Sequence, residues 1–272
     1  MLPAPTTPHA LASPVASRSW WWPVVIFVLG APLWLQIWEP AFFMAVNRWC
    51  APVVAEFWTG LSLLGNGWGL LAVTAPLLVL APRLMVAWLC AAPFAVLFAR
   101  TGKFFIESPR PAAVLDPAQM RVVGELLHNV SMPSGHTLTA FAVASGIYYA
   151  LTPVQRRRFG WLLWVLAAGA GLSRIAVAAH WPGDVAVGAS LGILSGLLGH
   201  QLWSRLSERQ FATGAWGLRL AAVLVALSVY HLVTEELDFP ENHVYQQVLA
   251  VVAVLSLLAY ARAAWRSMFK EK

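Results

Sequence analysis

The sequence predicts an all-α fold, a polytopic bundle of transmembrane helices, from three observations: high hydrophobic content, low charge and a series of long apolar windows. Hydrophobic residues make up 59% of the 272 positions and charged residues only 11%, with a mean hydropathy of +0.66. A soluble domain carries roughly a quarter charged residues, so this chain has too few to cover a water-facing surface. A disordered chain is excluded as well, because disorder requires low hydropathy and high charge.

Eight apolar windows provide the third observation. A bilayer core about 30 Å thick is crossed by roughly 20 helical residues. Windows with little or no charge lie at Trp20–Trp38, Gly60–Leu80, Leu84–Ala99, Pro133–Leu151, Trp161–Ala179, Asp184–Trp203, Leu218–Val233 and Val244–Ala261. Eight spans place both termini on the same side of the membrane.

The distribution of lysine and arginine indicates which side that is. Twelve of the 18 basic residues fall into cytoplasmic segments if the N-terminus is cytoplasmic, and cytoplasmic loops are enriched in these residues. The triple arginine Arg156–Arg158 is the strongest single anchor. We therefore expect a multi-pass protein of the bacterial inner membrane with both termini in the cytoplasm. The net charge of +6 is then the basic edge of membrane helices rather than a nucleic-acid surface.

The chain shows no linker that would separate soluble domains. Residues 1–19 are rich in Pro, Ala, Ser and Thr and are predicted to form a mobile tail. Residues 20–262 are predicted to form one transmembrane domain, and residues 263–272 a cytoplasmic C-terminal tail.

Three clusters of polar residues lie at the ends of predicted spans. Lys103–Arg110 follows the third window, Pro133–His136 opens the fourth, and Ser173–Asp184 joins the fifth to the sixth. Charges near membrane depth are costly and usually face a cavity or a partner. Windows three and five run outward and windows four and six run inward, so helix parity places all three clusters at the outer face.

The residue types in these clusters are typical of a phosphate site. Lys103, Arg110 and Arg174 supply three positive charges, and the planar fork of arginine suits phosphate oxygens. Ser134 and Gly135 begin a predicted helix, where free backbone N–H groups and the helix dipole attract an anion. A lone basic residue at a span end is more often an anchor. Convergence on the face where basic residues are depleted favours the phosphate site.

His136 and His180 are the candidates for proton transfer and nucleophilic attack. A neutral histidine is a competent nucleophile, and a carboxylate can fix its tautomer. Asp184 follows His180 by four residues, which places both on one face if the segment is helical. Pro182 suits a first helical turn, so His180 can instead lie just before the helix.

Other polar residues receive a structural interpretation. Asn66, within the second window, is expected to hydrogen-bond between helices. Glu107, His128 and Ser131 are interpreted as rim residues, and the acidic loop Thr234–His243 as a solvated turn.

The three clusters resemble the three-part signature of the type 2 phosphatidic acid phosphatase (PAP2) superfamily. The matching motifs are Lys103-x6-Arg110-Pro111, Pro133-Ser134-Gly135-His136 and Ser173-Arg174-x5-His180-x3-Asp184. Every motif position is filled, in order. The resemblance covers roughly residues 60–205 and implies a six-helix core, so either two of the eight predicted helices are additions to it or one predicted window is not a span.

The resemblance also implies a mechanism that needs neither a metal nor another cofactor. It assigns His180 as the nucleophile that becomes a phosphohistidine, Asp184 as the residue that holds its ring, and His136 as the acid that protonates the leaving oxygen. The residues implied to hold the phosphoryl oxygens are Lys103, Arg110, Ser134, Gly135 and Arg174.

The expected substrate is a lipid phosphate monoester or pyrophosphate whose headgroup reaches the outer leaflet. Undecaprenyl pyrophosphate, phosphatidylglycerol phosphate, phosphatidic acid and the 1-phosphate of lipid A all remain open. One alternative is a phosphotransferase on the same scaffold. A lipid or anion transporter is a second, disfavoured because the charges lie at one face and no internal repeat is found. Membrane lipids are the expected partners, and the oligomeric state stays open.

Overall fold

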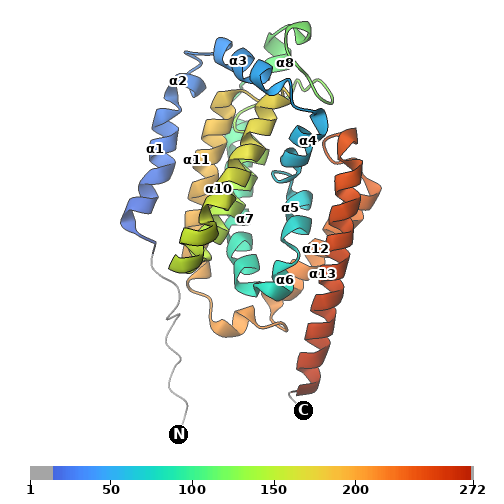
Figure 1. Cartoon of the computed structure of the whole chain (residues 1–272). Helices are drawn as coiled ribbons and strands as arrows, with labels where there is room; N and C mark the ends of the chain where they lie inside the picture. Colours follow the sequence, from blue (N-terminus) through green and yellow to red (C-terminus); the bar gives the residue numbers. More distant parts are fainter. Residues whose placement is uncertain (1–14, 271–272) are drawn as a thin grey trace.

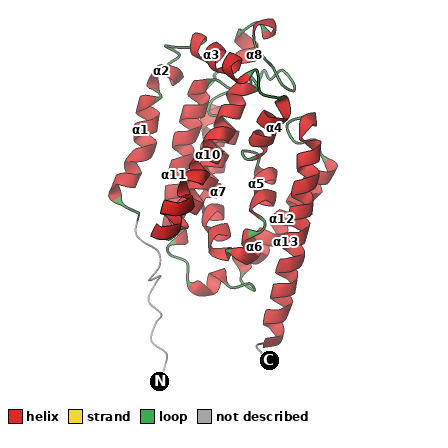
Figure 2. Cartoon of the chain, viewed as in Figure 1, coloured by secondary structure: helices red, strands yellow, loops and turns green. Residues whose placement is uncertain are grey.

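The computed structural model describes residues 15–270, and all regular secondary structure in that range is helical (Figures 1 and 2). The predicted all-α class is therefore confirmed. Most of the predicted N-terminal tail, residues 1–14, lies outside the described residues, as do residues 271–272. Helix α13 (His243–Lys270) continues through the described part of the predicted C-terminal tail.

Five helical segments in the described part of the chain are long and apolar enough to cross a membrane. They are Pro82–Phe105 (α7), Pro153–Ala176 (α10), Pro182–Trp203 (α11), Glu208–Thr234, which contains α12 (Trp216–Thr234), and Pro240–Ser267, which contains most of α13. They coincide with five of the eight predicted windows. A sixth window coincides with α9 (Gly135–Ala150), which is shorter.

The first two predicted windows are broken into short helices. The first forms α1 (Trp21–Leu29) and α2 (Ala31–Trp34), and the second falls largely within α4 (Ala55–Leu63), α5 (Gly67–Thr74) and α6 (Leu77–Leu80). The break before α5 has a local cause. Its N-cap is Asn66, whose side chain accepts hydrogen bonds from the backbone N–H groups of Trp68 and Gly69 and so starts a new helix.

The long helices run alternately up and down the bundle in Figure 1. The start of α1 and the end of α13 both lie at the lower end of the bundle. α11 packs against α9 and α7, α10 packs against α9, and α12 packs against α13 and α5. The polar clusters from the sequence therefore meet at the upper end.

Glycines allow α9 and α11 to pack closely at the centre of the bundle. A Cβ at Gly192 would lie 2.5 Å from the Leu138 carbonyl oxygen, and a Cβ at Gly196 would overlap the Ser145 hydroxyl. That hydroxyl lies 3.2 Å from the Gly192 carbonyl oxygen, to which it donates. Close contact along these two helices fixes the positions of their site-bearing ends.

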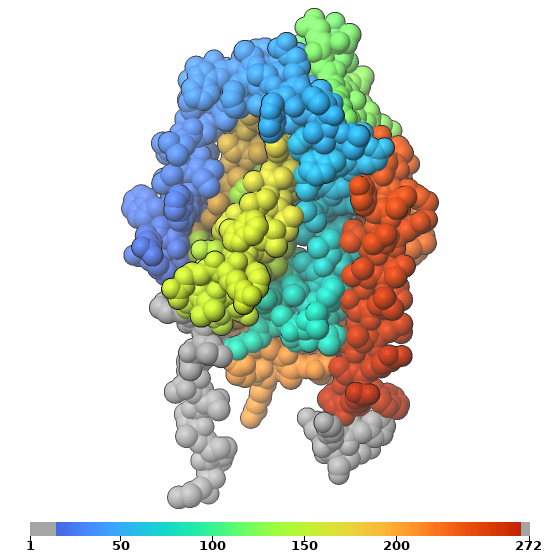
Figure 3. Space-filling model, in the orientation of Figure 1, coloured from blue at the N-terminus to red at the C-terminus, as the bar shows by residue number. Residues whose placement is uncertain are grey.

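Helix α3 (Ala41–Cys50) crosses the upper end of the bundle, which we call the α3 end (Figures 1 and 3). From α3, the Asn47 side-chain amide donates to the carbonyls of Ile175 and Ala176 and accepts from the Arg121 N–H. These bonds satisfy carbonyls at the C-terminus of α10 that have no partner within the helix. Short helical elements complete the described chain: α8 (Pro111–Val114) and 3-10 turns at Ser17–Trp20, Pro117–Gln119, Glu208–Phe211 and Pro240–Asn242.

Candidate active site

The connector between α10 and α11 determines where His180 lies. Ala178 adopts a left-handed conformation with φ 61°, and the N–H groups of Ala179 and His180 donate to the Arg174 carbonyl at 2.9 and 3.1 Å. This is a helix C-terminal turn of the kind usually made by glycine. α11 begins at Pro182, so His180 lies just before the helix. Of the two arrangements that the sequence left open, this one is correct.

The Asp184 carboxylate holds one side of the His180 ring. Both side chains are buried, and Asp184 Oδ2 lies 3.2 Å from His180 Nδ1. The same oxygen accepts hydrogen bonds from the Trp181 backbone N–H at 2.8 Å and from Ser131 Oγ at 2.5 Å. Nδ1 is therefore the ring nitrogen engaged by the carboxylate, and Nε2 is the one directed elsewhere.

The Arg110 side chain reaches His180 from the loop after α7. Its Nη1 lies 3.3 Å from His180 Nε2 and donates to the Ala179 carbonyl at 2.7 Å. The side chain is only 5% exposed, and its Nε has no acceptor among the described residues. A buried guanidinium with an unused donor beside a histidine nitrogen is suited to bind an anion there.

The other two predicted cations have partners of their own. Arg174 is 3% exposed and donates through Nη1 to Ser62 Oγ, while its Nε has no acceptor in the described part of the chain. Lys103 Nζ donates to the Val130 carbonyl at 3.2 Å. Both residues project from helices that end at the α3 end of the bundle.

Burial and neighbouring positive charges keep His180 neutral. Burial is the largest cause, followed by the charges of Arg110, Arg174 and Lys103 and by the His136 ring, and together they lower the pKa of His180 well below its usual value. An uncharged imidazole at neutral pH has a free lone pair on one ring nitrogen. The site thus holds His180 in the form that a nucleophile requires.

The helix that the sequence predicts to begin at Ser134 and Gly135 is α9. Ser134 is the N-cap; its hydroxyl accepts from the Thr137 N–H, and its own N–H donates to the Asp184 carbonyl at 3.1 Å. The Ser134 hydroxyl therefore serves the helix in this structure. At Gly135, no heavy atom lies within 4 Å of the place a Cβ would occupy, so a ligand can approach the backbone closely.

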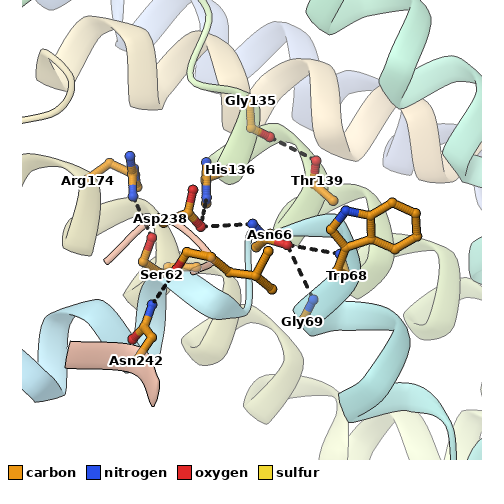
Figure 4. Close-up of polar contacts among 12 residues, drawn as sticks. Ser62, Asn66, Trp68, Gly69, Gly135, His136, Thr139, Arg174, Asp238 and Asn242 are labelled. Carbon is orange, nitrogen blue, oxygen red and sulfur yellow. Dashed lines mark hydrogen bonds and ion pairs between the residues drawn. The ribbon is translucent and has the colours of Figure 1, made fainter. Parts of the chain in front are cut away.

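Asp238 lies in the predicted solvated turn and is exposed, but its carboxylate also contacts His136, which the sequence did not predict. Its Oδ2 lies 2.9 Å from His136 Nε2 and 2.9 Å from Asn66 Nδ2. Figure 4 shows the carboxylate between the His136 ring and the Asn66 amide. Burial acts to raise the pKa of Asp238, but His136, Arg174 and the Asn66 hydrogen bond outweigh it and bring the pKa well below its usual value. The carboxylate is therefore ionised at neutral pH.

Of the predicted rim residues, Glu107 and His128 are exposed, but Ser131 is fully buried. Its Oγ donates to Asp184 and lies 3.3 Å from His180 Nδ1. The rim prediction for Ser131 was wrong, and its position three residues before Ser134 was the available signal.

A cavity of about 460 Å³ opens beside these residues. Arg174, Ala179 and Asp238 line it, together with the loop at residues 123–127. The Phe239 ring forms another part of the wall, with the Arg174 guanidinium carbon 5.6 Å from its centroid. Over residues 15–270, no three or more His, Cys, Asp or Glu side chains are grouped to hold a metal ion.

Comparison with known protein families adds an independent observation. The PAP2 superfamily model matches residues 83–208. Residues 83–208 belong to the PAP2 superfamily. The resemblance drawn from the motifs is thus confirmed, and all eight site residues predicted from them lie inside the PAP2 segment. Ser62, Asn66 and Asp238 lie outside it.

Two curated relatives each match about a quarter of this chain. The bacitracin transport permease protein BcrC of Bacillus licheniformis is 43% identical over 67 residues, which are 25% of this chain and 30% of that protein. The lipid A 1-phosphatase of Porphyromonas gingivalis is 40% identical over 70 residues, which are 26% of this chain and 16% of that protein. The chain therefore spans less than a third of the length of either relative.

Two solved structures share the PAP2 fold. The crystal structure of Aquifex aeolicus LpxE superimposes with a TM-score of 0.53 at 27% identity, covering 59% of this chain and 93% of that one. The transmembrane PAP2-type phosphatidylglycerolphosphate phosphatase of Bacillus subtilis has a TM-score of 0.51 at 24% identity, covering 69% and 98%. The protein is a multi-pass membrane protein with the PAP2 transmembrane fold.

Proposed function

We propose that this protein is a membrane lipid phosphatase that hydrolyses a lipid phosphate monoester or pyrophosphate through a phosphohistidine on His180. The observation that supports it most directly is the buried row Asp184–His180–Arg110. His180 Nδ1 lies 3.2 Å from the Asp184 carboxylate and Nε2 lies 3.3 Å from the Arg110 guanidinium. A neutral imidazole held at one nitrogen and flanked by an anion-binding group at the other suits attack on phosphorus.

In the proposed first step, the lone pair of His180 Nε2 forms a bond to phosphorus while the bond to the leaving lipid oxygen breaks. His136 gives its proton to that oxygen, because an alkoxide or phosphate leaving group departs more easily when protonated. Asp184 stabilises the positive charge that develops on the His180 ring. The phosphoryl oxygens are held by Lys103, Arg110, Arg174 and the backbone at Ser134 and Gly135.

In the second step, water attacks the phosphorus of the intermediate. His136, now neutral, takes a proton from that water, and the phosphorus–nitrogen bond breaks with its electron pair returning to Nε2. Inorganic phosphate then leaves. Lys103, Arg110 and Arg174 carry the charge neutralisation that a metal ion provides in many phosphoryl transfer enzymes, so the proposed reaction needs none.

We place the protein in the bacterial inner membrane, and the excess of lysine and arginine in alternate loops supports an orientation with both termini cytoplasmic and the site facing the periplasm. The relatives named as lipid A 1-phosphatase and phosphatidylglycerolphosphate phosphatase support a lipid phosphate substrate. Within that class we propose isoprenoid pyrophosphate, phosphatidyl phosphate and lipid A phosphate as the candidates to compare.

A substrate panel tests this proposal. Purified protein in detergent is given undecaprenyl pyrophosphate, phosphatidylglycerol phosphate, phosphatidic acid and lipid A at equal concentration, in the presence of a metal chelator, and released phosphate is measured. We expect release from at least one lipid by the wild-type chain and none above background by His180→Ala. Equal release by His180→Ala would contradict covalent catalysis, and loss on chelation that returns with added Mg²⁺ would contradict the metal-free mechanism.

The same assay separates hydrolysis from phosphotransfer. With a lipid labelled at phosphorus, hydrolysis yields labelled inorganic phosphate, whereas transfer moves the label to a second lipid or sugar. The name of one relative is that of a transport permease. In this chain the helix ends that carry the predicted phosphate-binding residues lie together at one end of the bundle rather than along a path through it (Figure 1), which favours an enzyme.

A further inference from the structure

The loop that carries Asp238 is held in place by buried contacts rather than being a mobile turn. Leu237 and Phe239, on either side of Asp238, are 6% and 4% exposed. The Leu237 N–H donates to Gln246 Oε1, and its carbonyl accepts from Asn242 Nδ2. Gln246 Nε2 in turn donates to the Glu235 carbonyl. These bonds present the intervening Asp238 to the bundle in one fixed position.

We propose that Asp238 is a positioning residue for His136: it holds the His136 ring through Nε2 and leaves Nδ1 to exchange the proton with the leaving oxygen. This inference rests on the proposed function. The contact is direct, with Oδ2 and Nε2 2.9 Å apart, and the side chains are 22% and 20% exposed.

Asn66 fixes the carboxylate from its other side. The Asn66 oxygen caps α5 by accepting from the N–H groups of Trp68 and Gly69, so its amide nitrogen must point the other way. That nitrogen donates to Asp238 Oδ2 at 2.9 Å (Figure 4). The cap thus orients the amide, the amide orients the carboxylate, and the carboxylate orients the ring.

The charges around His136 explain what the carboxylate contributes. Arg174 from α10 and Arg110 from the loop after α7 act on the His136 ring, and the His136 ring in turn acts on His180 in the α10–α11 connector. Positive neighbours disfavour the protonated imidazole that an acid must supply, and a carboxylate in contact favours it. Asp238 therefore counters the burial and the positive charges that disfavour the protonated His136 ring.

The site then contains two histidine–carboxylate pairs, one for nucleophilic attack and one for proton transfer. Asp184 holds the ring of the nucleophile His180, and Asp238 holds the ring of the acid His136. The first pair lies within the family segment, residues 83–208, whereas Asp238 comes from the loop between α12 and α13, outside it. The loop between α12 and α13 would thus contribute a positioning residue to the site.

Asp238→Asn tests the inference, with kcat, KM and the pH–rate profile measured on the best lipid of the panel. We expect kcat to fall about 10- to 100-fold, within the range of a general acid's contribution. The alkaline limb of the profile should move to lower pH, because the protonated ring is less favoured. In a His136→Ala background the same change should cost nothing further, since Asp238 acts through the ring.

Glu235→Gln is the matched control. Glu235 belongs to the same loop and its Oε1 lies 2.8 Å from His231 Nδ1, away from the site, so this change should leave both kcat and the pH profile as in the wild type. Asn66→Ser provides a second variant should Asp238→Asn fold poorly. Serine keeps a helix-capping oxygen but removes the amide donor, and the alkaline limb should shift in the same direction by a smaller amount.

Unchanged or increased activity in Asp238→Asn would overturn the inference. It would show that the carboxylate contributes nothing to the rate or hinders anion binding. An equal loss in the His136→Ala background would also overturn it. An active wild-type chain with either result leaves the proposed function standing. A wild-type chain that releases no phosphate from any lipid would instead contradict the proposed function, and this inference with it.

Discussion

Ser131 donates a hydrogen bond to the same Asp184 oxygen that contacts His180, so the carboxylate is held by a hydroxyl as well as by the nucleophile's ring. Ser131 lies in the loop before α9 and Asp184 in the first turn of α11. The bond therefore joins the loop before the second sequence motif to the last residue of the third motif. Besides the Ser131 hydroxyl, that oxygen contacts His180 Nδ1 and the Trp181 N–H among the described residues, so Ser131 is a third group that fixes the direction of the buried carboxylate.

Ser131→Ala should lower kcat about 10- to 100-fold, because a buried hydrogen bond to a charged group is worth about 1.5–3 kcal/mol and each 1.4 kcal/mol corresponds to about tenfold in rate. KM should change little, since Ser131 is not expected to touch the substrate. Ser108→Ala is the control: the Ser108 hydroxyl is buried with no hydrogen-bond partner among the described residues. Wild-type kcat in Ser131→Ala would show that Asp184 needs no third donor.

The pH dependence of kcat/KM should reflect the lowered pKa of His180. Its attack requires the neutral ring, and a lowered pKa keeps the ring neutral into acidic solution. After correction for the ionisation of the substrate phosphate, the acidic limb should therefore lie below about pH 6.5, which is the ordinary pKa of histidine. An acidic limb at or above pH 6.5 would indicate that the surrounding cations do not act on His180 as described.

Arg174→Lys should reduce kcat/KM about 10- to 100-fold although the charge is kept. The Arg174 guanidinium is anchored to Ser62 through Nη1, which leaves the rest of its planar fork to bind oxygen, and lysine has no such fork. Arg100→Lys, at an exposed position of α7, makes the same chemical change away from the site. Near-normal activity in Arg174→Lys would reduce its role to that of an anchor.

Gly196→Val should destabilise the bundle by about 1–3 kcal/mol or more, because overpacking at a close helix contact forces the helices apart. The added side chain would meet Ser145 on α9. Gly217→Ala, where a Cβ has nothing within 4 Å, is the control and should be neutral or slightly stabilising. Thermal unfolding in detergent compares the two, and equal transition temperatures would contradict the close α9–α11 packing.

Helix parity accounts for how much of the site could be predicted from the sequence. Alternating spans must bring the ends of α7, α9, α10 and α11 to one end of the bundle, and the contact of His180 with Arg110 follows from that alternation across 70 positions of sequence. The spacing from His180 to Asp184 was equally informative. A four-residue separation allowed contact both within a helix and across its first turn.

The remaining contacts leave no comparable pattern. Asp238 lies 102 positions from His136 and 172 from Asn66, and an acidic residue in a short loop looks the same whether it points to water or inward. The first two windows are apolar enough for continuous spans, yet the helices break at Gly30 and around Asn66. Hydropathy reflects the surroundings of a segment, whereas caps and glycines decide where its helices begin and end.

Direct detection of phosphohistidine is the closest test of covalent catalysis by His180. Purified protein is mixed with a substrate labelled at the phosphoryl group, quenched in alkali because phosphohistidine is labile in acid, and digested for mapping by mass spectrometry. We expect label on the peptide that contains His180, formed and lost at rates compatible with turnover, and absent from His180→Ala. Turnover without any labelled His180, or label on another residue of the active wild-type protein, would contradict it.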